Sequence, residues 1–292
     1  MKHINQNRME LSRLQEHIAS GKKITTASDS PVSFKEARNL EHQLRDKEFY
    51  QQQINQAKTT AQTAQQSLDE VVDRLIELKG IVVRGGNNMQ GTQAYQALAQ
   101  EVESIQGQLI HSLNSSDGRG YVFAGTASEN PPFVLDATVE LGVPKYAGGV
   151  RYDGTGQGNQ TQIEDGVYVN SSVTGESIRE VDGIDLFETI QNTVTALKAG
   201  DSTSLSAQLD DYDSLINHLT NETAKVAFEI NKMDFVFERQ ESIKNTIQAE
   251  LSSLVDTDFA ETFSQIQQSE LAFQSAMTVH SSIMNQSLLE YL

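Results

Sequence analysis

The sequence predicts a mainly α-helical protein with a small inserted β module, organised as an elongated long-helix bundle or coiled coil made from both chain termini. Three observations predict it. Apolar residues recur at spacings of three and four over long stretches, both ends carry heptad patterns, and residues 118–183 combine frequent glycine with short alternating segments. We therefore expect two halves of one helical domain, 1–117 and 184–292, with a β-rich outer domain at 118–183 inserted between them.

The N-terminal half begins with a short heptad pattern. Ile4, Leu11 and Ile18 are seven residues apart and Leu14 follows Leu11 by three, which predicts a helix over 3–20. Ser20-Gly21 ends it, and Ser30-Pro31 gives the N-cap and first position of the next helix. That helix should extend through Val82 to the break at 84–88, and a further helix should follow from 91.

The amino-acid composition and the hydrophobic pattern change at Gly118. Three of the four prolines lie in 118–183, and short apolar stretches alternate there with turn residues. Asp165-Gly166 stands between two such stretches and predicts a tight hairpin. We expect strands at 121–124, 133–135, 150–152, 161–164 and 167–169.

The helical period returns at Asp185 and is stopped by Gly200, and a long helix is expected from Ser202. Asp258 is the expected N-cap of the last helix. In that helix Phe259, Ile266, Phe273 and His280 fall seven apart, and the second heptad position is assigned to Phe263, Met277, Met284 and Tyr291.

Composition excludes several functions. The chain has 292 residues, no cysteine, and 22 basic against 40 acidic residues, a net charge of −18. Without cysteine there is no disulfide framework and no thiol-based metal site. The acidic balance argues against nucleic acid and anionic membrane surfaces as partners. At 37% hydrophobic the chain is lean, as expected of helices that bury a narrow stripe.

Known catalytic patterns are also missing from the sequence. There is no phosphate-binding loop, no nucleophile elbow and no zinc-binding H-E-x-x-H, and the six histidines are scattered. Nothing in 118–183 brings a base, a nucleophile and an oxyanion donor together, so an enzyme is not expected and neither is a cofactor or metal. A coiled-coil adaptor remains an alternative, although that function would not explain why both ends of the chain carry sequence motifs.

Several stretches, taken in order, resemble the flagellin-type axial proteins of the bacterial flagellum. The loop of that family, L-x-S-G-x-[RK]-I followed by A-x-D-[DS]-P, is similar to 18–24 and 27–31, and its C-terminal D-x-D-Y-A-E pattern is similar to 256–261. The helix turn at 82–102 and the segment at 121–126 also resemble the family. The ending 287–292, Ser-Leu-Leu-Glu-Tyr-Leu, resembles the S-L-L-D-Y-L tail of the hook–filament junction branch.

The resemblance implies a flagellin-like fold and a structural role. The protein would be exported without a cleaved signal peptide and work outside the cell. It would join the hook to the filament as a ring-like collar of copies, with the first hook-associated protein on one side, flagellin on the other and an export chaperone beforehand. The alternative is a flagellin-like filament subunit. In the family a further helical stretch usually precedes the position of Ile4, so the natural chain is expected to begin earlier.

The expected assembly interface lies on the terminal helices. The N-terminal helix, about five turns long, is marginal alone, and both chain ends are expected to become ordered against neighbouring copies. The residues assigned to this interface are Ile4, Leu11, Leu14, Ile18, Phe259, Phe263, Ile266, Phe273, Met277, Met284, Leu288 and Tyr291.

Overall fold

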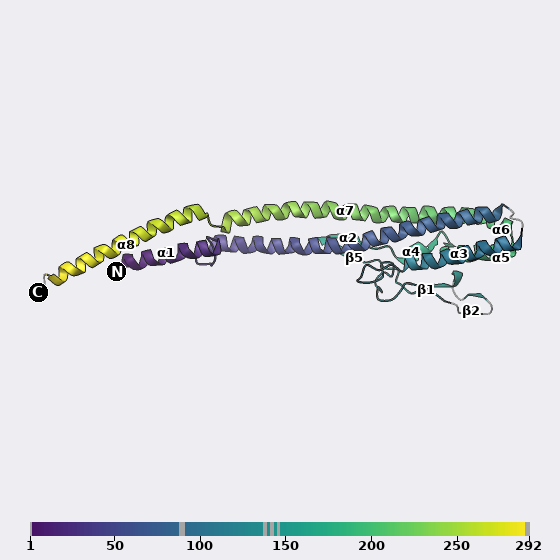
Figure 1. Ribbon diagram of the computed structural model, residues 1–292, viewed down its shortest axis with the longest axis horizontal. Coiled ribbons are helices and arrows are strands. Elements are labelled where there is room, and N and C mark those ends of the chain that lie inside the picture. Colours follow the sequence, from purple (N-terminus) through teal and green to yellow (C-terminus); the bar gives the residue numbers. More distant parts are fainter. Residues whose placement is uncertain (1, 88–90, 137–138, 141–142, 145–146, 290–292) are drawn as a thin grey trace. The chain divides into compact units, whose positions relative to one another are not determined.

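The structure is a computed structural model that describes residues 2–87, 91–136, 139–140, 143–144 and 147–289 (Figure 1). Side chains 2–4, 137–147, 281 and 283–292 lie outside the described part. Its helices are α1 (Lys2–Ser20), α2 (Pro31–Gly86), α3 (Thr92–Leu113), η1 (Ala147–Gly149), α4 (Gly175–Arg179), α5 (Leu186–Ala199), α6 (Ser202–Ala207), α7 (Leu209–Val255) and α8 (Phe259–Leu289). The strands are β1 (Phe133–Leu135), β2 (Val139–Glu140), β3 (Val143–Pro144), β4 (Val150–Tyr152), β5 (Gln160–Glu164), β6 (Val167–Asn170), β7 (Glu180–Val181) and β8 (Ile184–Asp185).

The chain forms two compact units. The first contains Met1–Glu48 and Gln240–Leu292, and the second contains Phe49–Arg239. Helices α2 and α7 each contribute one part to the first unit and the other part to the second. The boundaries expected from sequence at 117 and 183 remain a prediction.

Local signals fix most helix ends where the sequence predicts them. The Ser30 hydroxyl accepts a hydrogen bond from the Ser33 amide, and α2 starts at Pro31. Asp185 caps α5 by accepting from the Phe187 and Glu188 amides at 2.9 and 3.0 Å, and Gly200 ends that helix in the left-handed conformation, at φ 69°. The expected single helix from Ser202 is divided at Gln208.

In the second unit, α2 and α7 run antiparallel (Figure 1). Two ion pairs set their register, because Lys58 contacts Asp234 while Lys79, further along α2, contacts the earlier Asp213. Helices α3 and α5 complete a core that is continuous along α2. Its fully enclosed α2 residues are Ile54, Ala61, Ala64, Leu68, Val71, Leu75, Leu78, Ile81 and Val82.

The strands form four separate antiparallel pairs, β1–β4, β2–β3, β5–β6 and β7–β8. The β5–β6 pair confirms the hairpin expected at Asp165-Gly166, with Gly166 at φ 71°. The module is tied to α3 by Asn114, whose side-chain amide donates to the Phe133 carbonyl at 2.7 Å and accepts from the Phe133 amide at 2.9 Å.

The strand expected at 121–124 is wrong. Tyr121 makes only an isolated bridge to Ser116, and Val122, Phe123 and Ala124 are all buried instead of alternating. The segment is a buried loop held by the Val122 amide donating to Ser115 and by Tyr152 Oη donating to the Phe123 carbonyl. A run of buried apolar residues does not by itself distinguish a strand from such a loop.

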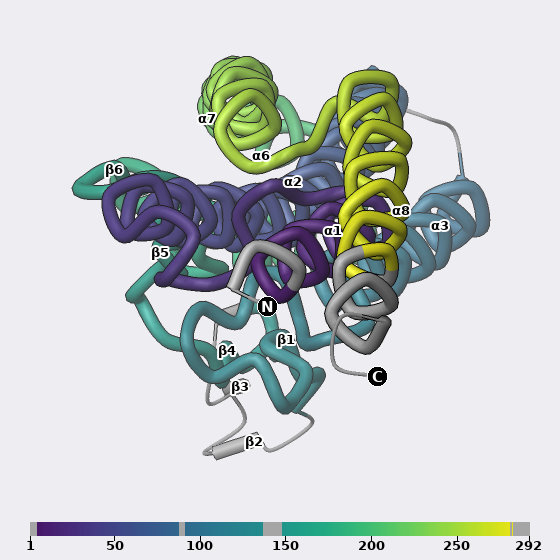
Figure 2. The backbone as a smooth tube through the Cα atoms, turned by 90° about the vertical axis from the view of Figure 1, so that its left-hand side faces the viewer, coloured from purple at the N-terminus to yellow at the C-terminus, as the bar shows by residue number. Residues whose placement is uncertain are grey.

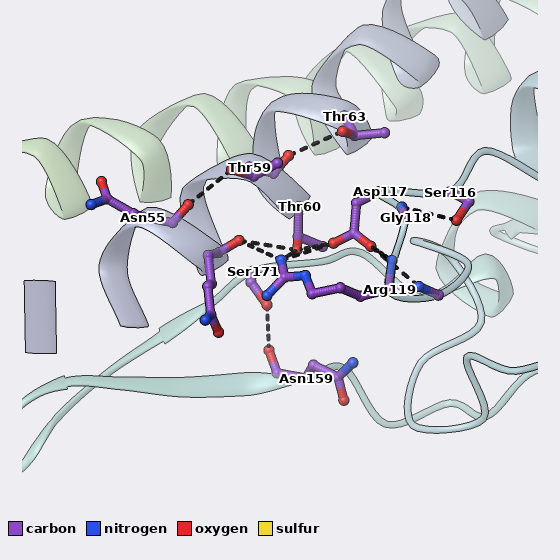
Figure 3. Close-up of polar contacts among 12 residues, drawn as sticks. Asn55, Thr59, Thr60, Thr63, Ser116, Asp117, Gly118, Arg119, Asn159 and Ser171 are labelled. Carbon is purple, nitrogen blue, oxygen red and sulfur yellow. Dashed lines mark hydrogen bonds and ion pairs between the residues drawn. The ribbon is translucent and has the colours of Figure 1, made fainter. Parts of the chain in front are cut away.

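A polar cluster anchors the entrance to this loop on α2 (Figure 3). Arg119 Nη2 donates to the Gln56 carbonyl at 2.8 Å and lies 3.0 Å from Asp117 Oδ2, and the Thr60 hydroxyl donates to Asp117 at 2.5 Å. Burial raises the pKa of Asp117, but the bonds from Thr60 and Arg119 outweigh it and hold the pKa below its usual range. The cluster therefore fixes where the chain leaves the helices.

The small side chains on α2 give a test of this core. Ala61→Leu should destabilise the second unit by about 1–3 kcal/mol, because the enclosed site has no room for three extra carbons. Gln62→Leu, on the exposed side of the same turn, is the matched control and should change stability by less than about 0.5 kcal/mol. Urea unfolding followed by circular dichroism measures both; equal losses would contradict the assigned packing.

Candidate assembly surface on the terminal helices

Helices α1 and α8 lie side by side within the first unit (Figure 2). The two loops that precede α2 and α8 are joined by backbone hydrogen bonds, from the Lys23 amide to the Val255 carbonyl at 2.7 Å and from the Thr257 amide to the Gly21 carbonyl at 3.0 Å. Gly21 takes φ 71°, which lets the chain turn directly after α1. These bonds align the first turns of α8 with the end of α1.

Part of the predicted interface is packed inside this pair. Leu14 is 4% exposed and Ile266 is 9% exposed, while Leu11, Ile18 and Phe273 are half-buried. The heptad spacing expected on α1 is thus the face that it turns inward. These five residues hold the two helices of one chain together.

The remaining predicted residues on α8 are exposed. Phe259, Phe263 and Met277 keep 57%, 56% and 47% of their surface. Leu271 and Val279, which the heptad pattern did not identify, have exposed fractions of 65% and 58%. At 100° per residue these five side chains are spread around the part of α8 that does not face α1. They are called the exposed apolar residues of α8 below.

The sequence analysis placed Phe263 and Met277 at the second heptad position of α8, but the buried positions lie one residue earlier in the chain. The residues that accompany Ile266 and Phe273 on the buried side are Thr262, Ser269 and Ala276, not Phe263 and Met277. They are small, so a search for large apolar residues passes over them. Small residues are what a close helix pair needs at its contact, and the large ones are left outside.

Four predicted residues cannot be placed. The backbone is helical at Ile4, Met284 and Leu288, but their side chains are outside the described part, and Tyr291 is outside the described residues altogether. Their place in the interface stays a prediction.

The loop before α2 is ordered by one carboxylate. Asp29 Oδ2 accepts hydrogen bonds from the Thr26 and Thr25 amides at 2.8 and 3.0 Å and from both threonine hydroxyls. The backbone bonds from Thr26 and Thr25 lower the pKa of Asp29 to about 2. These hydrogen bonds therefore hold the loop 22–29 in a defined conformation.

Nothing in the described part suggests catalytic chemistry. Over those residues no three histidine, aspartate or glutamate side chains gather as a metal site would require. The helices in the described ranges also include none with the length and apolarity needed to cross a bilayer.

The two faces of α8 should respond differently to a buried charge. Ile266→Asp should destabilise the first unit by about 3 kcal/mol, because it places a carboxylate between α1 and α8. Phe263→Asp should change stability by less than about 0.5 kcal/mol, since that side chain already meets solvent. Hydrogen exchange of amides 5–20 and 259–280 measures the difference, and similar exchange in both variants would refute the division.

Protonation of the Asp29 carboxylate should disrupt the hydrogen bonds of the loop at low pH. Its folded pKa is lower than that of an unfolded aspartate, so its contribution is present above about pH 4 and is lost as pH falls toward about 2. NMR titration should give a midpoint near pH 2 for Asp29, with the Thr25 and Thr26 amide shifts following it. In Asp29→Asn these amide shifts should no longer titrate; an ordinary midpoint near 4 would exclude the bonded loop.

Comparison with known proteins supports this description. The bacterial flagellin N-terminal helical region matches residues 1–127. Flagellar hook-associated protein 3 of Escherichia coli is 22% identical over 99% of this chain and 95% of its own length. The flagellin of Bacillus subtilis is 23% identical over the same shares of both chains.

A solved flagellar hook-associated protein from Vibrio parahaemolyticus has the same fold. It aligns with a TM-score of 0.68 at 20% identity, covering 78% of this chain and all of that one. The fold class expected from sequence, long helices with a small β module, is confirmed. The chain is therefore similar to the bacterial flagellins over residues 1–127 and to flagellar hook-associated protein 3 over nearly its whole length.

Proposed function

We propose that the protein is the structural joint between the flagellar hook and the flagellin filament. Copies assemble as a ring-like collar, with the first hook-associated protein on the hook side and flagellin on the filament side. The observation that carries the proposal is the set of exposed apolar residues on α8, in a chain similar to hook-associated protein 3 from end to end.

The physical argument starts from the cost of these side chains in water. Burying a phenylalanine fully gains roughly 1.5–3 kcal/mol relative to leaving it exposed. A helix that is apolar on most sides is stable only when it is surrounded. Because α1 covers one side of α8, the other sides need helices from neighbouring copies. Phenylalanine and methionine are also the residues that protein interfaces favour.

The exposed apolar residues of α8 also give a reason why the protein would need an export chaperone. Phe259, Phe263 and Leu271 are each more than half exposed, so free monomers present them to one another before assembly. An export chaperone that covers the terminal helices prevents this. The protein leaves the cell through the flagellar export apparatus without a cleaved signal peptide, which suits a chain with no cysteine to cross-link.

We further propose that the protein has no enzymatic activity. The proteins that it is similar to are flagellar hook-associated proteins and flagellins, and a structural joint acts through its contact surfaces. The flagellin of Bacillus subtilis keeps a second candidate open, a filament subunit. Purified protein that polymerises alone into long filaments would favour that candidate, whereas failure to do so favours the junction.

A charge on the exposed side of α8 should block assembly. In a strain whose own gene is replaced, Phe263→Asp should give cells with hooks but no filaments, flagellin in the medium and lost motility. Gln62→Asp places the same charge at an exposed polar position of α2, away from the exposed apolar residues of α8, and is the matched control, with normal filaments expected.

Secretion is measured alongside to keep the result interpretable. Both variants should reach the culture supernatant in equal amounts, since the charge lies on an exposed residue and leaves the fold intact. Normal filament growth with secreted Phe263→Asp protein would disprove the assigned surface.

A further inference from the structure

An apolar stripe lies on the outer side of α7 in the second unit. Phe228 and Phe235 are seven residues apart, about 10 Å along the helix, and keep 67% and 66% of their surface. Between 221 and 239, the charged residues of α7 within about 60° of these rings are Lys225, Lys232 and Arg239. We call the two phenylalanines and these three cations the α7 stripe. Large rings exposed in this way mark a contact surface.

The α7 stripe presents its cations outward and holds their acidic partners underneath. Lys225 pairs with Glu222 at 2.7 Å, and the two side chains are 71% and 10% exposed. Arg239 pairs with Glu164, and these side chains are 44% and 20% exposed. Because an ammonium or a guanidinium has more donors than one carboxylate contact uses, both cations can also receive a carboxylate from outside.

A second stripe, on α2, has the opposite charge. Ile76 and Val83 repeat the spacing of seven residues and are 54% and 44% exposed. Gly80 lies between them, and a Cβ added there would have nothing within 4 Å. Asp69 and Asp73 lie on the same side of the helix, and neither forms an ion pair within the described part of the chain. We call these five residues the α2 stripe.

The two acids of the α2 stripe disfavour each other's charge. Partial burial, and then repulsion by Asp73, raise the pKa of Asp69. A cation brought beside this pair from another molecule would relieve the repulsion. The α2 stripe is therefore complementary to the α7 stripe in charge, and both have apolar residues at the same spacing.

The two stripes lie at different levels of the second unit. Lys58 contacts Asp234 and Lys79 contacts Asp213, so residues 228–235 run beside residues 57–64 of α2. The α2 stripe is roughly 28 Å further along α2. The stripes therefore cannot cover each other within one chain, and only a second molecule can bring them together.

We propose that the α7 stripe of one copy packs against the α2 stripe of a second copy. This inference rests on the proposed assembly of copies and adds a surface distinct from α8. When copies point the same way, α7 of one runs antiparallel to α2 of the other, since the two helices are antiparallel within a chain (Figure 1). Phe228 then lies on Val83. Phe235 lies on Ile76, and the open position at Gly80 leaves room for the rings.

The charges agree with this antiparallel arrangement. When two antiparallel helices face each other, residues turned in the same sense from the contact line come to the same side of the contact. Arg239 is turned by about 20° from Phe228. Asp69 and Asp73 are turned from Ile76 in the same sense, by about 20° and 60°. The arrangement therefore brings Arg239 beside Asp73, whereas parallel helices would put the acids and the cations on opposite sides.

Because the two stripes differ, the contact is heterologous. A copy that uses its α7 stripe on one neighbour keeps its α2 stripe for another. One kind of contact can therefore join many copies, and two identical positions never meet across it.

The first experiment uses the absence of cysteine, which confines crosslinking to introduced positions. Asn231 and Gly80 are exposed and lie at the same level of the proposed contact. Strains whose own gene is replaced carry Gly80→Cys, Asn231→Cys or both, and detached hook–filament structures are treated with a flexible bismaleimide. The double variant should give a ladder of dimers, trimers and longer products, while each single variant should stay monomeric.

A second experiment mixes the two secreted single variants at high concentration and follows the rate of dimer formation. Phe235→Ala should lower this rate about tenfold, whereas Phe49→Ala, an exposed ring outside both stripes, should leave it unchanged. Asp73→Lys should also lower the rate, and Arg239→Asp on the partner copy should restore it. Glu77→Lys, an exposed acid outside the α2 stripe, is the matched control for the charge.

Three results would overturn the proposal: no ladder in hook–filament structures that contain the double variant, a ladder from a single variant, or equal effects of Phe235→Ala and Phe49→Ala. Absence of the protein from these structures would instead refute the proposed joint. In that case the mixed copies in solution decide the contact by themselves, and a lack of dimers there would refute it.

Discussion

The contact between α1 and α8 combines a few large apolar side chains with small ones, and most of the large apolar residues of α8 are left outside it. Thr262, Ser269 and Ala276 share the inner face of α8 with Ile266 and Phe273, so the two helices can approach closely over a narrow strip. A strip this narrow cannot also cover Phe263 or Leu271. The chain therefore covers the apolar residues of α8 only in part, and the uncovered ones form the surface on which the proposed assembly depends.

The second unit, in contrast, buries its large apolar residues in a core formed by the chain itself. Its core is continuous from α2 through α3 and α5 to α7, and it includes a buried polar pair, in which the Thr193 and Tyr212 hydroxyl oxygens lie 2.9 Å apart. The β module is fastened to that core at both of its ends, by Asp117 and Arg119 at the entrance and by the Asp185 cap at the exit. All residues of this core belong to the second unit, so its packing does not depend on the terminal helices.

Much of this architecture could be predicted from the sequence because it depends on local chemistry. Ser30-Pro31, Asp185 and Gly200 act through backbone groups within a few residues, and the hairpin at Asp165-Gly166 does the same. The division at Gln208 and the loop at 121–124 could not be predicted, since both depend on distant partners: Gln208 accepts from Thr193, and the loop is held by Tyr152. The assembly residues assigned from the sequence stay a prediction, and which of the described ones face inward depends on small residues that carry little hydrophobic signal.

The acidic charge of the chain bears on how such a surface avoids premature contact. A net charge of −18 opposes the approach of two copies at long range, whereas burial of apolar side chains acts only at contact. At physiological ionic strength the repulsion is screened beyond about 8 Å, so it acts between charges that lie close together, both when free copies meet and across a formed contact. In the proposed joint, burial of the exposed phenylalanines of α8 therefore has to outweigh the repulsion between acidic side chains near the contact.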